Sequence, residues 1–228
     1  MSIPVLIYPV LNRFDLLNKS LSCIDYPINE ILVINNSGDD SQTLGIKEAH
    51  PNLNIRILNL PSNMGVAGSW NLGIKLYPWV NYWMFGSADT TMPPGSWEQF
   101  HLASGSDKFV STRVAGWSMF TLGENIIEKT GLLDEYLYPA YFEDTDYGTR
   151  FQQQGFTVEN GNIVHLEIEA DQNGISQTIK SNPEYFAKNQ YTYWQNSEYY
   201  LNKVATGDWT SKGWDLKRRR DHEWLPKH

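Results

Sequence analysis

The 228-residue sequence contains a single cysteine, Cys23. One cysteine cannot form a disulfide within the chain, and this scarcity is typical of proteins from a reducing compartment. Long hydrophobic runs are also missing, since no stretch approaches the roughly 20 apolar residues that span a bilayer. The first apolar run is broken by Pro4 and Pro9 and has no basic segment before it, which is unlike a signal peptide. We therefore expect a cytoplasmic protein.

The sequence is also poor in positive charge. It has 18 Lys and Arg residues against 26 Asp and Glu residues, which gives a net charge of −8 at pH 7. This balance argues against broad binding to nucleic acid, which depends on basic surfaces. An anionic substrate would need a metal ion or a local basic group beside it. Aromatic residues, in contrast, make up 14% of the chain and include nine Trp. Flat aromatic rings can fill a core, and they can also stack on the faces of sugar rings.

Apolar runs alternate with segments of helical periodicity along the first 170 residues. The pattern predicts strands at 3–8, 30–35, 54–60, 80–85, 108–112, 156–159 and 162–166. It predicts helices at 15–24, 41–50, 69–76, 97–102, 123–130 and 142–154. This alternation is typical of a single α/β domain with a mainly parallel central sheet flanked by helices. Polar clusters at 35–40 and 86–89 follow predicted strands, at the sheet edge where ligands bind in such folds.

The last sixty residues have a different character. Residues 184–202 are periodic and rich in Tyr and Trp, and the chain ends in the basic sequence KRRRDHEWLPKH. We expect a core over 1–170 and a helical, aromatic-rich extension over 171–228 that packs on the core and is not an independent domain. The aromatic run is more typical of a packed helix than of a glycan-binding platform. The basic run 217–220 is typical of a solvated tail, and attachment to phosphate or an anionic surface is the alternative.

Three carboxylates gather in YFEDTDYGTR, residues 141–150: Glu143, Asp144 and Asp146. Acidic groups beside apolar bulk are where pKa values shift and where a general base can be built. Asp89 follows one predicted strand, and His165 lies near the end of another. An aspartate, a histidine and a carboxylate cluster can together hold a divalent metal and a base. This set of residues indicates metal-assisted group transfer.

Short motifs occur in a fixed order over roughly residues 3–166. From the N-terminus they are YPVLNR, INNSGDD, NMGVAGSWNLG, FGSADT, AGWSMFTL, TGLLDEYL, FEDTDYGTR and IVHL. In this order they resemble the family 2 glycosyltransferases, which have the GT-A fold, a Rossmann-like α/β domain. The sharpest match is FEDTDYGTR, which corresponds to the family's E-D-x-D-x-x-x-R helix start. FGSADT is an imperfect match to the metal-binding D-x-D motif.

The resemblance implies a hexosyltransferase that moves a sugar with inversion from a nucleotide donor, as in polysaccharide biosynthesis. It implies a UDP-linked donor, Mn²⁺ or Mg²⁺ as the cofactor, and a glycan, lipid-linked compound or other hydroxyl compound as the acceptor. A lipid-linked acceptor would bring the protein to a membrane surface. By position in the motifs, the donor-binding residues are Pro9, Asn12, Arg13, Asn35, Asp39, Asn63, Gly65, Asn71, Ser87, Ala88 and Asp89.

Two departures from the family pattern alter these assignments. Asn35 stands where the family usually has an aspartate that binds the base, and its amide can still hydrogen-bond a uracil edge. Ser87 and Ala88 replace acidic positions of the metal motif, so Asp89 is its last carboxylate. We therefore assign the metal to Asp89 and His165. A mixed nitrogen and oxygen ligand set suits Mn²⁺ better than Mg²⁺.

For catalysis, the resemblance favours Asp144 as the general base, because it matches the second position of the family's E-D pair. Glu143 is the second catalytic residue and shapes the site. Asp146 contributes to binding of the acceptor, which we expect to approach near Gly116, Trp117 and the C-terminal aromatic residues.

Structural explanations compete with each assignment. Acidic residues in a first helical turn suit the helix dipole. Asp89, Asn35 and Asp39 can be turn formers, His165 a structural histidine and Arg13 a surface charge. For the whole protein, the alternatives are a degenerate transferase-like module that binds glycans, and a sugar nucleotidyltransferase. The latter usually carries a Gly-rich basic segment after the first strand, which YPVLNRFD lacks.

Overall fold

The computed structural model describes residues 1–171, 177–180 and 182–221. One sheet contains seven strands in the order β3-β2-β1-β4-β6-β5-β7. The strands are β1 (Leu6–Val10), β2 (Ile31–Asn35), β3 (Ile55–Asn59), β4 (Tyr82–Gly86), β5 (Phe109–Thr112), β6 (Gly116–Gly123) and β7 (Ile163–Leu166). β6 runs antiparallel to β4 and β5, and the other neighbouring pairs are parallel. The predicted α/β class with a mainly parallel sheet is confirmed.

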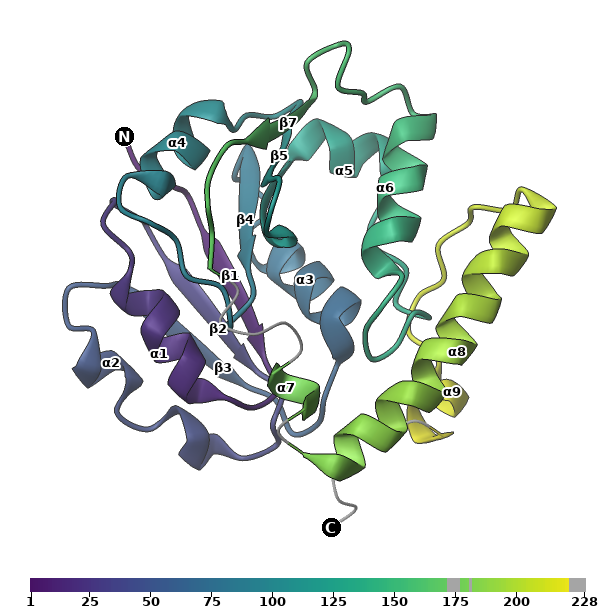
Figure 1. Ribbon diagram of the computed structural model, residues 1–228, viewed down its shortest axis with the longest axis horizontal. Helices are drawn as coiled ribbons and strands as arrows, with labels where there is room; N and C mark the ends of the chain where they lie inside the picture. The colour runs from purple at the N-terminus through teal and green to yellow at the C-terminus, as the bar shows by residue number, and fades with distance from the viewer. Residues whose placement is uncertain (172–176, 181, 222–228) are drawn as a thin grey trace.

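Helices cover both faces of this sheet (Figure 1). One face packs against α1 (Phe14–Ser22), α2 (Ile46–Ala49) and α4 (Ser96–Ala103). The other face packs against α3 (Gly65–Leu76), α5 (Glu124–Thr130) and α6 (Glu143–Gln153). Both faces of the inner strands are therefore buried, which explains why these strands read as continuous apolar runs.

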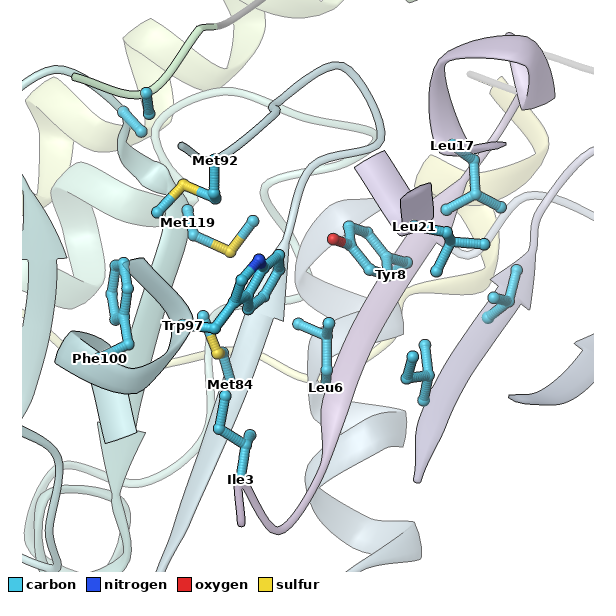
Figure 2. Close-up of a cluster of buried hydrophobic side chains, with 14 of the residues drawn as sticks. Ile3, Leu6, Tyr8, Leu17, Leu21, Met84, Met92, Trp97, Phe100 and Met119 are labelled. Carbon is cyan, nitrogen blue, oxygen red and sulfur yellow. The ribbon is translucent and has the colours of Figure 1, made fainter. Parts of the chain in front are cut away.

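The alternation of side chains along β1 shows how the two cores are built. Leu6 and Tyr8 belong to one core and Ile7 to the other, because successive side chains of a strand point to opposite faces. Figure 2 shows the first core, in which Tyr8 lies near Leu21 and Trp97 lies among methionine side chains. The Trp97 side chain is fully buried, and its Nε1 donates to the carbonyl of Cys23 at 2.9 Å.

The observed elements differ from the predicted ones in three segments. The segment 116–123 forms β6, which the sequence did not reveal because its apolar residues are interrupted by Ser118 and Thr121. The segment 156–159 is not a strand, since side-chain hydrogen bonds between Thr157 and Asn160 close a turn there. The predicted helix at 41–50 is split into a 3₁₀ turn, η1 (Asp40–Thr43), and α2, because Gly45 between them adopts a left-handed φ of 78°.

The C-terminal part contains α7 (Gln177–Lys180), the long α8 (Pro183–Thr206) and α9 (Leu216–Asp221). α8 lies beside α6 at one side of the molecule (Figure 1). The side chain of Asn182 caps its first turn, and Gly207 ends it at a φ of 69°. Parts of the predicted extension, 172–176, 181 and 222–228, lie outside the described residues. Among the helices that are described, none is both long enough and apolar enough to cross a bilayer.

Buried charges hold α8 against the core. Lys203 Nζ lies 2.6 Å from Asp134 Oδ2 and 2.6 Å from Asp146 Oδ1. Arg150 Nε binds the other oxygen of Asp146 at 2.8 Å, and Tyr199 donates to Asp134 at 3.0 Å. All four charged side chains are at most 5% exposed. Removing one partner would leave a buried charge without compensation, so this cluster ties the extension firmly to the core.

Candidate active site

A cavity of about 340 Å³ opens where the carboxyl ends of β1 and β4 meet the start of α6. This volume lies at the lower end of the range of roughly 300–1,000 Å³ for small-molecule sites. Its position is the crevice outside the strand ends, where ligands bind in open α/β sheets. The lining residues are Pro9, Leu11, Asn36, Asn63, Gly65, Val66, Trp70, Gly86, Ser87, Asp89, Trp117, Ser118, Pro139, Ala140, Tyr141, Glu143, Asp144 and Ile179.

A strained turn presents the acidic pair to this cavity. Tyr141 and Phe142, directly before α6, have φ angles of 77° and 71°. The left-handed region is unfavourable for bulky side chains, and residues held there cluster at functional sites. Because α6 begins directly after this turn, Glu143 and Asp144 project from its first residues into the cavity.

Glu143 is the buried member of the pair, with 7% of its surface exposed. Burial raises the pKa of Glu143 to about 8, and the negative charge of Asp144 adds to this effect. No hydrogen-bond partner for its Oε2 atom is present among the described residues. At neutral pH this carboxyl is therefore mostly protonated, and it can donate a hydrogen bond to a ligand oxygen.

Asp144 is the more exposed member of the pair. Its Oδ1 accepts hydrogen bonds from the backbone N–H and the hydroxyl of Thr145, at 2.7 and 3.2 Å. These bonds fix the orientation of a carboxylate that lines the cavity. The two neighbouring acidic residues therefore differ in burial and in hydrogen bonding.

Asp89 lines the cavity from the loop after β4. Its Oδ1 accepts a hydrogen bond from the Ser87 hydroxyl at 2.6 Å, while Ala88 packs against the core and does not line the cavity. Arg13 lies close enough for its pKa to be raised, first by the hydrogen bond to Asp15 and also by the charge of Asp89. Arg13 itself has a left-handed φ of 58°. A strained arginine thus stands near the carboxylate of the metal motif.

A divalent ion needs several oxygen or nitrogen ligands around it. Within the described ranges, no three His, Cys, Asp or Glu side chains form a group that could hold a metal by itself. Mg²⁺ and similar ions are commonly held by one or two carboxylates together with substrate phosphates and water. Asp89, partly exposed in the cavity and steadied by Ser87, fits that arrangement.

His165 does not join this site. Its side chain is exposed on β7, where its Nδ1 lies 2.9 Å from the hydroxyl of Ser111 on β5. Two strands, β6 and β5, lie between β4 and β7 in the sheet, and His165 does not line the cavity. The structure therefore gives no support to the prediction that His165 shares an ion with Asp89.

The turn after β2 uses Asn35 for internal bonding. Its amide nitrogen donates to Asp39 O and to Asn59 Oδ1, and its oxygen accepts from the N–H and the hydroxyl of Ser37. These four bonds fill the capacity of a side-chain amide, so nothing remains for a nucleotide base. Asp39 caps η1 through Ser41 N and does not line the cavity. The residue of this turn that lines the cavity is Asn36.

The start of α3 is built around Asn63 and Gly65. Backbone N–H groups of residues 64, 65 and 66 already bind Asn36 Oδ1, Asn63 Oδ1 and Pro139 O. Gly65 is required here, since its φ is 76° and a Cβ would lie 2.8 Å from Pro139 O. These three N–H groups are therefore not free to bind an anion. Asn71, predicted to bind the donor, instead binds the backbone of Leu133 and the side chain of Glu135.

Aromatic side chains form one wall of the cavity. Trp70, Trp117 and Tyr141 line it, and the first two rings stack at 6.4 Å. The Nε1 of Trp70 is buried, and the described residues provide no acceptor for it. Gly116 does not line the cavity, and Asp146 is fully buried in the ion cluster with Lys203 and Arg150. An acceptor contact through Asp146 is therefore not supported.

Of the predicted site residues, the cavity brings together Pro9, Asn63, Gly65, Ser87, Asp89, Trp117, Glu143 and Asp144. It does not include Asn12, Arg13, Asn35, Asp39, Asn71, Ala88, Gly116, Asp146 and His165. Sequence reasoning missed Asn36, Trp70 and the segment 139–141. Asn36 lies inside the motif INNSGDD and Trp70 inside NMGVAGSWNLG, so the neighbouring motif residues were the available signal. The segment 139–141 is separated from the acidic pair by Phe142 alone.

No family model and no curated protein sequence matches this chain. Among solved structures, the mannosyltransferase PcManGT from Pyrobaculum calidifontis, in complex with GDP-Man and Mn²⁺, matches with a TM-score of 0.58 and 15% identity. That match covers 95% of this chain and 66% of the other.

Two structures of S. aureus TarS also match. One has a TM-score of 0.51 and 16% identity, over 66% of this chain and 33% of TarS. The other, TarS 1-349 in complex with UDP-GlcNAc, has a TM-score of 0.50 and 14% identity, over 66% of this chain and 53% of that one. The chain thus spans between about a third and two thirds of the length of these neighbours. At such low identity the likeness concerns the fold, and the fold of this chain is that of the GT-A glycosyltransferases.

Proposed function

We propose that this protein is an inverting, family 2-like glycosyltransferase that transfers a sugar from a UDP-sugar to a hydroxyl group of a glycan or a lipid-linked acceptor. Mn²⁺ or Mg²⁺ would assist at the donor diphosphate. One observation carries the proposal: a single cavity at the strand ends of a GT-A fold joins Asp89 with Glu143 and Asp144. GDP-Man with Mn²⁺ and UDP-GlcNAc are the ligands of two structural neighbours.

On the donor side, the negative charge of a diphosphate must be balanced. The three N–H groups at the start of α3 are already bonded, so they cannot supply this balance. Arg13 offers positive charge near Asp89. A divalent ion bound by Asp89 would act as a Lewis acid toward the leaving diphosphate. Ser87, by donating to Asp89 Oδ1, keeps that carboxylate oriented into the cavity.

On the acceptor side, Asp144 takes the proton from the attacking hydroxyl as general base. Inversion requires this base on the face of the sugar opposite the leaving group. Glu143, protonated at neutral pH, donates a hydrogen bond to a sugar oxygen and does not compete for the proton. Trp117 and Tyr141 provide flat surfaces for stacking on the sugar and the acceptor.

A donor panel tests the proposal. UDP- and GDP-sugars are incubated with the protein in Mn²⁺, Mg²⁺ or EDTA, with and without simple glycoside and lipid-phosphate acceptors. We expect metal-dependent release of UDP, and NMR of the product should show an inverted anomeric configuration. A preference for GDP-sugars would change the proposed nucleobase of the donor from uracil to guanine. Retention of the anomeric configuration would contradict the assignment of Asp144 as general base. Glycan binding with no turnover on any donor would favour a binding module, while release of pyrophosphate from a sugar phosphate and a nucleoside triphosphate would favour a nucleotidyltransferase.

A further inference from the structure

The face of α8 that meets the core is polar, whereas core-facing helix faces are usually apolar. Its buried residues are Asn189, Thr192, Asn196 and Lys203. Large apolar side chains lie on the exposed side of the same helix, among them Phe186, Trp194 and Leu201. Burial of large apolar side chains therefore does not by itself explain how this helix docks, and its buried polar contacts are part of the explanation.

Asn196 makes the contact that reaches the active site. It is fully buried, and its Nδ2 donates to the carbonyl of Ala140 at 2.8 Å and to that of Tyr141 at 3.2 Å. Both acceptors belong to the turn that lines the cavity and directly precedes Glu143. One amide group from the C-terminal helix thus binds two consecutive carbonyls of the loop that presents the acidic pair.

This turn needs outside support. Tyr141 and Phe142 are consecutive aromatic residues in the left-handed region, a conformation that persists only when the surroundings impose it. α8 supplies further contacts here, since the Phe142 ring lies 5.2 Å from Tyr193 and 5.6 Å from Tyr200. The Tyr141 ring lies 5.5 Å from Tyr193. Loop and helix therefore interlock at several points, with Asn196 making the hydrogen bonds.

Asn196 is itself held from the other side. Its Oδ1 accepts a hydrogen bond from Nη2 of Arg218 on α9. The guanidinium of Arg218 lies 4.3 Å from the centre of the Tyr136 ring. Both ends of the Asn196 amide are therefore occupied, so it has one orientation. The chain of contacts runs from α9 through Asn196 to the turn and the start of α6.

We propose that Asn196 is a positioning residue, which fixes the left-handed turn at 141–142 so that Glu143 and Asp144 face the cavity. Its effect on turnover rests on the proposed function, but its effect on Glu143 does not. The ion cluster around Lys203 anchors the same helix to Asp134 and Asp146, neither of which lines the cavity. Anchoring and positioning are therefore carried by different residues of α8, and they can be separated by mutation.

The test compares Asn196→Leu with Asn189→Leu in the full chain. Leucine keeps the approximate volume and removes the amide. Asn189 is the matched control, because it is buried on the same face of α8 two turns earlier and its Oδ1 binds no described group. The first readout is the pKa of Glu143, measured without substrate by NMR of ¹³C-labelled glutamate. The second is the division of any kinetic effect between kcat and the donor KM.

In Asn196→Leu we expect the turn to relax and expose Glu143, so that its pKa falls by about one unit or more from the raised value. We expect kcat to fall about 10- to 100-fold, as for a small misplacement of reacting groups, with the donor KM nearly unchanged. Asn189→Leu should leave both readouts at wild-type values. Equal pKa values for Glu143 in wild type and Asn196→Leu would overturn the proposal, as would equal effects of the two variants.

Asn196→Asp serves as the second variant if Asn196→Leu does not fold. It keeps the size and the contact with Arg218 but removes the two donors to the turn. We expect the same loss of kcat with little change in KM, and wild-type kcat would contradict the positioning role. A wild-type protein that transfers no sugar would refute the proposed function instead. In that event the Glu143 pKa in folded Asn196→Leu, or the amide chemical shifts of residues 140–142 in Asn196→Asp, would still decide the role of Asn196.

Discussion

Glu143 and Asp144 are neighbours in the chain and line the same cavity, yet only Glu143 is buried there. Burial raises the pKa of Glu143 to about 8, and the charge of Asp144 contributes to the rise. At neutral pH the Glu143 carboxyl is therefore mostly protonated, chiefly because it is buried. This difference supports a division of roles, with Asp144 as proton acceptor and Glu143 as hydrogen-bond donor.

Asp144→Asn should abolish most turnover and leave donor binding intact. The change keeps the shape of the side chain and removes the base, so kcat should fall by roughly 10²–10⁴. Calorimetry with UDP and steady-state transfer, measured on the same preparation, separate binding from chemistry. Near-normal transfer by Asp144→Asn would refute the assignment, and a comparable loss confined to Glu143→Gln would move the role of base to Glu143.

Glu143→Gln should make stability less sensitive to pH. The pKa of Glu143 is raised on folding from 4.5 to about 8. Between these values the folded protein holds a proton that the unfolded chain has released. The wild type therefore loses up to about 1.4 kcal/mol of unfolding free energy per pH unit as pH rises through this window. The variant lacks this contribution, so its stability relative to wild type should increase steadily from about pH 5 to pH 8.

Urea unfolding of both proteins at several pH values measures the difference. Glu98→Gln is the control, because Glu98 is an exposed acidic residue in the first turn of α4. A constant difference between Glu143→Gln and wild type across the pH range would show that Glu143 is not held protonated in the folded state.

Asn35→Ala should affect stability first. The side chain makes four hydrogen bonds within the turn and to Asn59. Its loss leaves buried partners unsatisfied, at a cost of about 1–3 kcal/mol in unfolding free energy. Chemical unfolding should show this loss, whereas UDP affinity at a temperature where the variant is fully folded should change little. A large fall in UDP affinity with normal stability would instead restore Asn35 to base recognition.

The sequence predicted those parts of the fold whose signal lies within one short stretch of the chain. β1, β2 and β4 are continuous apolar runs because both faces are buried, and these runs are visible in the chain. Glu143, Asp144 and Asp89 were found because carboxylates in apolar surroundings are uncommon. β6 was missed because Ser118 and Thr121 interrupt its apolar residues, so the segment reads neither as a continuous run nor as a simple alternation.

Several of the assignments that the structure does not support depend on partners distant in sequence. Asn71 is occupied by Leu133, and Asp146 by Lys203, which lies 57 positions away. A motif shows which residue types are present but not which of them a distant segment has already bound. Trp70 illustrates the converse case, since a tryptophan in a helix suggests core packing, and only the structure shows that it also lines the cavity.

Asp89→Ala should weaken donor binding only when a divalent ion is present. A carboxylate near a diphosphate repels it, and it becomes favourable only through a cation held between them. In Mn²⁺ we expect UDP affinity to fall by about tenfold or more. In EDTA the variant should bind UDP as well as the wild type or more tightly, because a repulsive charge has been removed while Arg13 remains.

Ser87→Ala, which only frees Asp89 to rotate, should show a smaller loss in Mn²⁺. Equal losses with and without the ion would mean that Asp89 shapes the loop after β4 and does not bind the metal.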